Sequence, residues 1–233
     1  MATENSSPGP RPRSRASVFL VDDHPLVRDG LRNLINQQPD LMVCGEADDS
    51  VGAAAAIGEL RPNIAVVDLS LRSGSGIDLI KDLRIQCPDV PIIVLSMHDE
   101  SLYAERVLRA GARGYVMKRE TARNIVTGIR RVLAGEVYIS EAFARNTTER
   151  LLIGRHTSPV GGLPVDGLSD RELEVFRRLG QGHSTSQIAA DLRLSLKTVQ
   201  AYCARIKTKL GLANATELLR EALRFEDGAG QVR

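Results

Sequence analysis

The sequence predicts two domains of different class, a doubly wound α/β domain followed by a small all-α bundle. Three observations support this. Short apolar runs alternate with helical patterns over residues 16–136, whereas residues 168–228 show only helical periodicity with capping signals. Between these regions, residues 154–167 contain four glycines, two prolines and no apolar period, which is typical of a linker.

The first domain contains five short apolar runs that are rich in β-branched residues, at 18–21, 41–44, 64–67, 90–95 and 114–117. Runs of this kind predict strands buried on both faces. Helical patterns lie between and after them, at 26–36, 51–60, 77–85, 101–110 and 122–134. Five βα units with right-handed crossovers form a parallel sheet that is covered by helices on both faces.

The remaining segments follow from composition and capping signals. Residues 1–15 are rich in Ser, Pro and Arg and predict a disordered leader, and residues 137–167 predict a linker with a short helix at 142–152. In residues 168–228, Ser169 and Ser184 each begin a capping box, and Ser195 caps a third helix that ends at Leu210. A fourth helix is expected at 217–225.

The composition is that of an ordinary globular protein of 233 residues, with 42% hydrophobic and 26% charged residues. Cys44, Cys87 and Cys203 are far apart and lack metal-ligand spacing, so we expect reduced thiols and a cytoplasmic location. No apolar run approaches the ~20 residues that a membrane helix needs. The net charge of +2 is uneven: residues 16–140 hold 17 acids and 14 bases, whereas residues 193–209 hold five bases and no acid.

Polar residues follow four of the predicted strands. Asp68 ends the third strand, Asp22 and Asp23 follow the first, Ser96 follows the fourth and Lys118 follows the fifth. Each alone has a commoner explanation, such as a helix cap, a loop hydroxyl or a solvated charge. Together they lie at one edge of the sheet, where three carboxylates require a hard cation such as Mg²⁺. A metal, a lysine, a hydroxyl and a carboxylate nucleophile are what phosphoryl transfer onto a carboxylate requires.

The segments Val21-Asp-Asp-His-Pro25, Val67-Asp-Leu-Ser-Leu71, Leu95-Ser-Met97 and Gly114-Tyr-Val-Met-Lys118 resemble the receiver domain of bacterial response regulators. The resemblance implies a CheY-like (flavodoxin-like) fold, and it implies that Asp68 accepts a phosphoryl group from a sensor histidine kinase. It further implies that Mg²⁺ is bound by Asp23 directly, by Asp22 mainly through water, by Asp68 and by the backbone carbonyl of Ser70. By the same resemblance, Ser96 and Lys118 hold the phosphoryl group. Tyr115 is at the position of the aromatic switch.

The chain departs from the receiver pattern at two positions. Arg72 stands where the family often has proline, and Arg119 follows the lysine of the site. Both lie beside the site, where they affect phosphate lifetime or partner choice, and neither removes a required group. The four histidines, His24, His98, His156 and His183, show no ligand spacing and are interpreted as non-catalytic, with His98 close enough to tune the site.

The third helix of the second domain has one apolar stripe, formed by Val199, Cys203, Ile206 and Leu210. The residues on its other faces are small, polar or basic, and such residues suit contact with base edges and phosphates in a DNA major groove. A solvated basic helix explains the charge equally well. The predicted DNA contacts are Lys197, Thr198, Gln200, Ala201, Tyr202, Ala204, Arg205, Lys207 and Lys209.

The wider pattern favours DNA binding. Leu168-Ser-Asp-Arg-Glu-Leu-Glu-Val175, Ile188-Ala-Ala-Asp-Leu192, Lys197-Thr-Val199 and Ile206-Lys-Thr-Lys-Leu-Gly211 resemble the LuxR-type helix-turn-helix domain of the NarL/FixJ family. The resemblance implies a transcription regulator that binds double-stranded DNA, commonly as a homodimer.

Two alternatives remain open at this point. One is a phosphorylation-independent DNA-binding regulator whose receiver site is unused. The other is a phosphatase with an aspartyl-phosphate intermediate, which is disfavoured because Ser70 stands where a second acid is needed and no capping insertion is visible. The interpretation is therefore a response regulator and not an enzyme.

Overall fold

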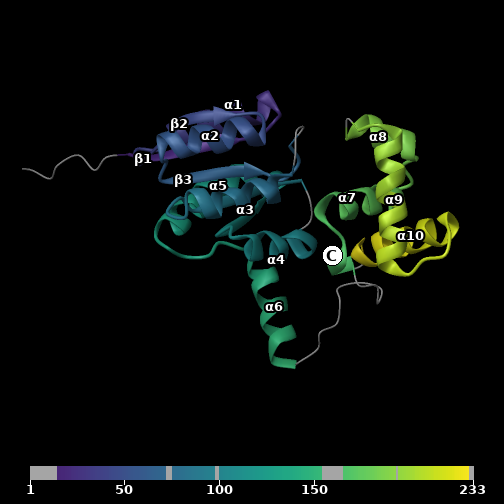
Figure 1. Cartoon of the computed structure of the whole chain (residues 1–233). Helices are drawn as coiled ribbons and strands as arrows, with labels where there is room; N and C mark the ends of the chain where they lie inside the picture. Colours follow the sequence, from purple (N-terminus) through teal and green to yellow (C-terminus); the bar gives the residue numbers. More distant parts are fainter. Residues whose placement is uncertain (1–14, 72–74, 98–99, 154–164, 193, 231–233) are drawn as a thin grey trace, which may run out of the picture.

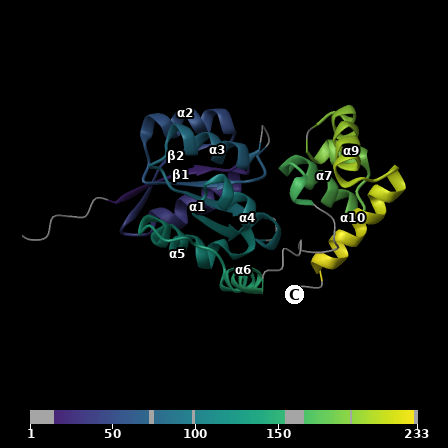
Figure 2. The same ribbon diagram turned by 60° about the horizontal axis from the view of Figure 1, so that its bottom comes forward.

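The computed structural model describes residues 15–71, 75–97, 100–153, 165–192 and 194–230. It shows an α/β domain and a helical C-terminal domain that lie side by side (Figures 1 and 2). The first domain contains a five-stranded sheet whose order is β2-β1-β3-β4-β5. Its strands are β1 (Ala16–Val21), β2 (Leu41–Ala47), β3 (Ile64–Asp68), β4 (Ile92–Ser96) and β5 (Gly114–Met117).

All four strand pairs are parallel. The chain therefore needs a crossover between successive strands, and each crossover is a helix: α1 (Pro25–Asn36), α2 (Ser50–Leu60), α3 (Gly76–Gln86) and α4 (Glu100–Ala110). The last helix of the domain, α5 (Thr121–Leu133), follows β5 and a short 3₁₀ turn, η1 (Lys118–Glu120). The predicted doubly wound fold is confirmed.

Two apolar clusters cover the two faces of the sheet. On one face, α1 and α5 pack through Leu31, Ile35, Ile125 and Ile129 against the side chains of the central strands. On the other face, α2, α3 and α4 pack against the alternate side chains of the same strands. Because successive residues of a strand point to opposite faces, strands covered on both sides must be apolar on both, as β3 and β4 are up to their last residues, Asp68 and Ser96.

Local signals explain where the helices begin. Asp49 caps α2 by accepting hydrogen bonds from the amides of Val51 and Gly52, and Ser75 caps α3 through the amide of Ile77. The structure lengthens several predicted elements by one to three residues, most clearly β2, which continues beyond the expected residue 44 to Ala47. In β2, Met42 and Glu46 belong to an edge strand that is only half-buried, so its apolar pattern is weak.

Of three further segments, two differ from the sequence expectations and one agrees with them. Arg15 was assigned to the leader, but its guanidinium donates to the backbone carbonyls of Asn36 and Gln38, at 2.8 and 2.9 Å. The expected helix at 142–152 is present as α6 (Glu141–Ile153). The last residues of the expected linker form a 3₁₀ turn, η2 (Val165–Gly167), whose Val165 is buried. The rest of the leader, residues 1–14, and residues 154–164 of the linker lie outside the described residues.

The C-terminal domain contains α7 (Asp170–Gly180), α8 (Thr185–Asp191), α9 (Leu196–Leu210) and α10 (Ala215–Gly230). The capping boxes at Ser169 and Ser184 and the cap at Ser195 are confirmed. Helix α10 is longer than predicted. It crosses α7 so closely that a Cβ at Gly180 would lie 2.3 Å from the carbonyl oxygen of Ala222. Within the described ranges, the helices are all too short or too polar to cross a membrane.

Candidate functional site

The carboxyl edge of the sheet brings the predicted acidic residues together. Because the last residues of β1 pair with those of β3, the residues that follow the two strands are neighbours. Asp22, Asp23 and Asp68 are 2%, 6% and 1% exposed, and one oxygen of each lies within 4.8 Å of the others. Three buried carboxylates at this separation repel one another unless cations balance them.

Lys118 supplies part of that balance. It follows β5, and its buried Nζ lies 2.7 Å from Oδ2 of Asp68 and 2.6 Å from Oδ2 of Asp22. Burial alone would lower the pKa of Lys118, but the two carboxylates outweigh it and raise the pKa, so the ammonium stays charged. The clustered carboxylates are hard oxygen donors, which suit a divalent cation.

The two oxygens of Asp68 have different partners. Oδ1 accepts a hydrogen bond of 3.2 Å from the amide of Ser70, whereas Oδ2 faces Lys118. Burial raises the pKa of Asp68, and the nearby charge of Asp22 adds to the rise, while Lys118 and the amide of Ser70 oppose it. The carboxylate is thus held in a fixed orientation, and its burial favours the protonated form over the charged form.

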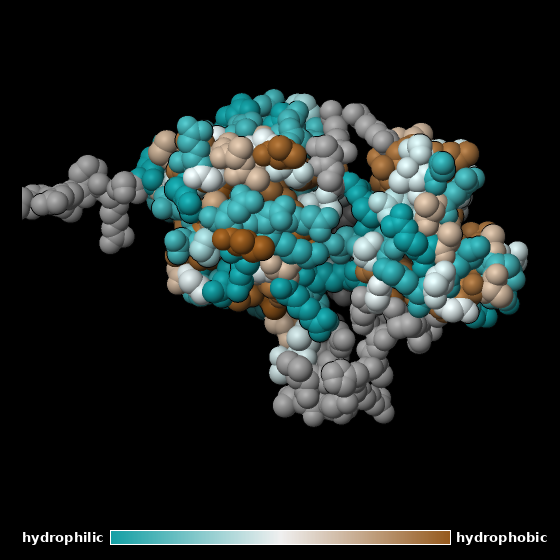
Figure 3. All heavy atoms as spheres, viewed as in Figure 1, coloured by the Kyte–Doolittle hydropathy of each residue, from teal (hydrophilic) through white to brown (hydrophobic). Residues whose placement is uncertain are grey.

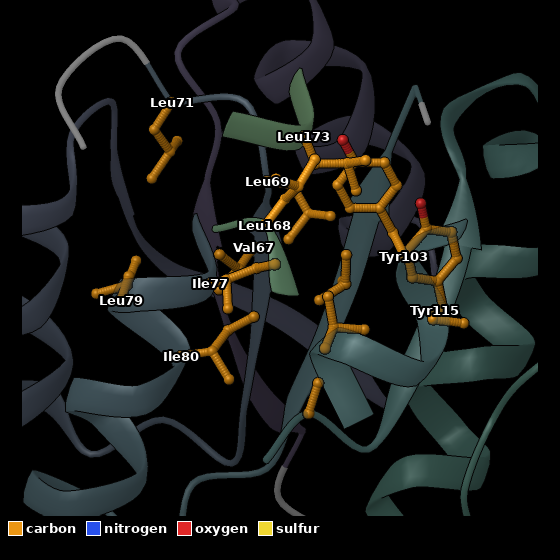
Figure 4. Close-up of a cluster of buried hydrophobic side chains, with 14 of the residues drawn as sticks. Val67, Leu69, Leu71, Ile77, Leu79, Ile80, Tyr103, Tyr115, Leu168 and Leu173 are labelled. Atoms are coloured by element: carbon orange, nitrogen blue, oxygen red, sulfur yellow. The ribbon is translucent and has the colours of Figure 1, made fainter. Parts of the chain in front are cut away.

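The remaining predicted residues lie at the ends of neighbouring strands. Ser96 is the last residue of β4 and is fully buried, and it pairs in register with Met117, which immediately precedes Lys118. Tyr115, in the middle of β5, is 2% exposed. In Figure 4 the ring of Tyr115 lies next to that of Tyr103 from α4, and both belong to one apolar cluster. Every predicted residue of this site is therefore at the same edge or directly behind it.

Sequence reasoning missed two residues of the site. His24 was interpreted as non-catalytic, but its Nδ1 lies 2.7 Å from Oδ1 of Asp23 and belongs to the same potential ligand group. Gly76 is required by backbone geometry, since a Cβ there would lie 2.3 Å from the carbonyl oxygen of Asp68. The sequence shows no sign of this contact, because it depends on how the start of α3 packs against the end of β3. His98, His156 and Arg72 lie outside the described residues, whereas His183 belongs to the helical domain, where it lies 3.7 Å from Asp191.

Helix α9, which is predicted to bind DNA, has the expected buried apolar face and exposed polar face. Val199, Ile206 and Leu210 are buried, and Cys203 is half-buried. Helix α8 packs against α9, and the short turn between them ends at the cap Ser195, which makes a helix-turn-helix. Most of the predicted contact residues are exposed, namely Lys197, Gln200, Ala201, Ala204, Arg205 and Lys209, whereas Thr198, Tyr202 and Lys207 are half-buried.

Two of the predicted DNA contacts have partners inside the domain. Lys209 Nζ lies 2.7 Å from a carboxylate oxygen of Glu172, which is 2% exposed. Burial would raise the pKa of Glu172, but its hydrogen bonds from Lys209 and from Ser169 outweigh burial and lower the pKa. Thr198 shares a 2.8 Å hydrogen bond with Ser195 in the helix cap. Both residues therefore have structural roles that the basic pattern of the sequence does not reveal.

Comparison with known proteins agrees with both sites. Residues 18–130 match the family model described as the response regulator receiver domain, and residues 166–222 match that of the bacterial regulatory proteins of the luxR family. The oxygen regulatory protein NreC of Staphylococcus epidermidis is 33% identical over 210 residues, which covers 89% of this chain and 96% of NreC. The chain belongs to the NarL/FixJ-type response regulators. It is a two-component transcription regulator with a LuxR-type domain, and not an enzyme.

Solved structures of this family are similar along most of the chain. A LuxR-family response regulator from Aurantimonas sp. SI85-9A1 is 36% identical with a TM-score of 0.56, and it covers 60% of this chain and 99% of its own. RcsB of Salmonella enterica serovar Typhimurium, bound to promoter rprA with the phosphomimetic BeF3⁻, is 28% identical with a TM-score of 0.58. That match covers 90% of this response regulator and 99% of RcsB.

In this response regulator, α4 of the receiver contacts the start of the DNA-binding domain. The guanidinium of Arg106 donates to the backbone carbonyls of Leu168 and Val165, at 2.7 and 2.6 Å, and it lies 3.5 Å from a carboxylate oxygen of Asp170. One helical turn before Arg106, Tyr103 is 3% exposed beneath the DNA-binding domain. The guanidinium of Arg177 from α7 lies 6.0 Å from the centre of its ring.

Helix α7 also reaches the loop that follows Asp68. Arg171 donates to the carbonyl of Leu71 at 3.2 Å, and Leu173 packs in the same cluster as Leu69 and Tyr103 (Figure 4). A cavity of about 220 Å³ separates α7 from the acidic site, and Asp23 and Arg171 are both in its wall. The DNA-binding domain of this response regulator therefore covers one approach to the acidic site.

Proposed function

We propose that Asp68 accepts a phosphoryl group from a sensor histidine kinase, with Mg²⁺ bound by Asp22, Asp23, Asp68 and the backbone carbonyl of Ser70. The observation that carries this proposal is the group of three buried carboxylates at one edge of the sheet, with the ammonium of Lys118 beside two of them. When bound, Mg²⁺ supplies positive charge to the phosphoryl oxygens. Family membership supports the choice of a histidine kinase as the donor.

The chemistry of the transfer follows from the fixed position of Asp68. One carboxylate oxygen forms a bond to phosphorus while the bond from phosphorus to the kinase histidine breaks, and the released imidazole takes up a proton. Lys118 then shares its charge with the new phosphoryl oxygens, and the Ser96 hydroxyl donates to one of them. Asp22, Asp23 and Lys118 act by position and charge, so the receiver holds the phosphoryl group without turning over a substrate.

The signal then has a short path to the DNA-binding domain. Helix α4 begins four residues after Ser96, and its Tyr103 and Arg106 are among the receiver side chains that contact α7 and η2. Movement of the Ser96 loop and of Tyr115 would shift this helix and loosen those contacts. Phosphorylation thereby moves the equilibrium from the closed arrangement towards one in which the DNA-binding domain is released from the receiver.

In the open form, α9 enters the major groove of double-stranded DNA and its basic side chains contact phosphates. We expect an active homodimer in the cytoplasm, because two linked DNA-binding domains bind paired DNA half-sites more tightly than a single domain binds one half-site. The structure of two RcsB dimers bound to two parallel DNAs supports DNA and a second copy as partners.

Intact-mass spectrometry tests the first step without knowledge of the kinase. The chain is incubated with Mg²⁺ and acetyl phosphate, with Asp68→Asn as the matched control and with a chelator in a third sample. We expect one added phosphoryl mass in the wild type, lost in the variant and in the chelated sample. A wild type that gains no mass while it binds Mg²⁺ would instead support a regulator that works without phosphorylation.

A further inference from the structure

The junction of the two domains contains a second cavity, larger than the one beside the acidic site. It is a cleft of about 700 Å³ between α3 and α4 of the receiver and the α7 and α9 helices of the DNA-binding domain. Hydrophilic residues predominate where the two domains meet in Figure 3. The volume lies in the range of small-molecule sites, about 300–1,000 Å³. Its basic lining residues are Lys81, Arg84, Arg106, Arg109, Arg171 and Arg205.

Four of these six cations already have acidic partners. Asp78 pairs with Lys81, Asp170 with Arg106, Glu105 with Arg109 and Glu174 with Arg171. For Arg84 and Arg205, no described carboxylate lies within ion-pair distance of 4 Å. The cleft therefore contains two positive charges that the described residues do not balance, one from each domain.

Both guanidinium groups have supported positions. The stem of Arg84 lies over the end of α4, where a Cβ at Gly111 would be 2.7 Å from its Cδ. The guanidinium of Arg205 lies 4.9 Å from the centre of the Tyr202 ring, which also lines the cleft. Ile77 and Ile85 form an apolar part of the same wall, and Ile85 is 80% exposed. The cleft thus offers fixed positive charge beside exposed apolar surface.

We propose that this cleft binds a small polyanion with at least two negative charges, an oligophosphate chain, held between Arg84 of the receiver and Arg205 of the DNA-binding domain. Such a ligand joins the two domains and relieves the repulsion between two like charges, so it stabilises the closed form. It also occupies Arg205, which the proposed function assigns to DNA. The polyanion and DNA therefore compete, and each lowers the affinity for the other by the same factor.

Isothermal titration calorimetry on the unphosphorylated full chain tests the site. The probe is inorganic triphosphate, without Mg²⁺ and at constant ionic strength, and a second arm uses ATP. We expect saturable binding of one triphosphate per chain and at least a tenfold loss of affinity in Arg84→Gln. Arg145→Gln, an exposed charge on α6, is the control and should bind within twofold of the wild type. Tighter binding of ATP would identify a nucleotide as the source of the phosphate chain, and equal binding would identify an inorganic chain.

The position of Arg84 makes the result decisive, because this residue belongs to the receiver and not to the DNA-reading helix. If triphosphate binds Arg84→Gln as it binds the wild type, or binds without saturation, the cleft site is refuted. The melting temperature of each variant confirms folding. Asp68→Asn should bind triphosphate normally, so a failure of phosphorylation at Asp68 and a failure of this site are separate outcomes.

Discussion

The contact of Arg106 with the DNA-binding domain allows a quantitative test of how the receiver holds the closed form. Arg106→Ala removes two hydrogen bonds from a charged donor to the carbonyls of Leu168 and Val165. Each such bond contributes about 1.5–3 kcal/mol, and the lower value suits a side chain that is still 17% exposed. The closed form should therefore lose about 3 kcal/mol, close to a hundredfold in its equilibrium with the open form. A chain that is about 99% closed would become about half open.

Small-angle X-ray scattering of the unphosphorylated protein measures this change directly. The radius of gyration should increase in Arg106→Ala, and affinity for a generic DNA duplex at low salt should rise with it. Arg109→Ala is the matched control, because Arg109 lies on the same helix but is 76% exposed, and among the described residues its ion pair is with Glu105 of the receiver. Equal radii and equal DNA affinities for the wild type and Arg106→Ala would refute the assignment of Arg106 as an interdomain contact.

Four further predictions follow from the sites. Mg²⁺ at about 100 times its Kd should stabilise the wild type by about 2.7 kcal/mol, and Asp23→Asn should lose most of that gain in a thermal scan. Folding raises the pKa of Asp68, mainly through burial, so its contribution to stability is lost as pH rises through that pKa. Without Mg²⁺, Asp68→Asn should therefore be more stable than the wild type at pH 7, and equal chemical denaturation curves would contradict this. The pKa of Glu172 is lowered, so its contribution to stability is present above the ordinary value of 4.5 and is lost as pH falls. Lys209→Gln should lower the free energy of unfolding by about 1–3 kcal/mol at pH 7. The difference between this variant and the wild type should vanish in acid. DNA affinity should fall steeply between about 50 and 200 mM salt. Lys197→Gln should reduce the slope of log affinity against log salt concentration. An unchanged slope would exclude Lys197 as a phosphate contact.

The sequence alone determined the fold class and most of the first site. Buried parallel strands must be apolar on both faces, and their carboxyl ends must share one edge, so Asp22, Asp68 and Lys118 were placed together by strand order alone. Helix caps at Ser169, Ser184 and Ser195 are local interactions, so short sequence patterns located three helix starts in the second domain.

Tertiary structure decided what depends on residues far apart in the chain. The contact of Gly76 with the carbonyl of Asp68 depends on how the start of α3 packs against the end of β3, and the ion pair of Lys209 with Glu172 depends on how α9 crosses α7. The contact of Arg106 with Leu168 joins residues 62 positions apart. Periodicity and composition record only which faces are apolar or charged. Which charged side chain meets which carbonyl or carboxylate is settled only when the helices and the two domains pack together.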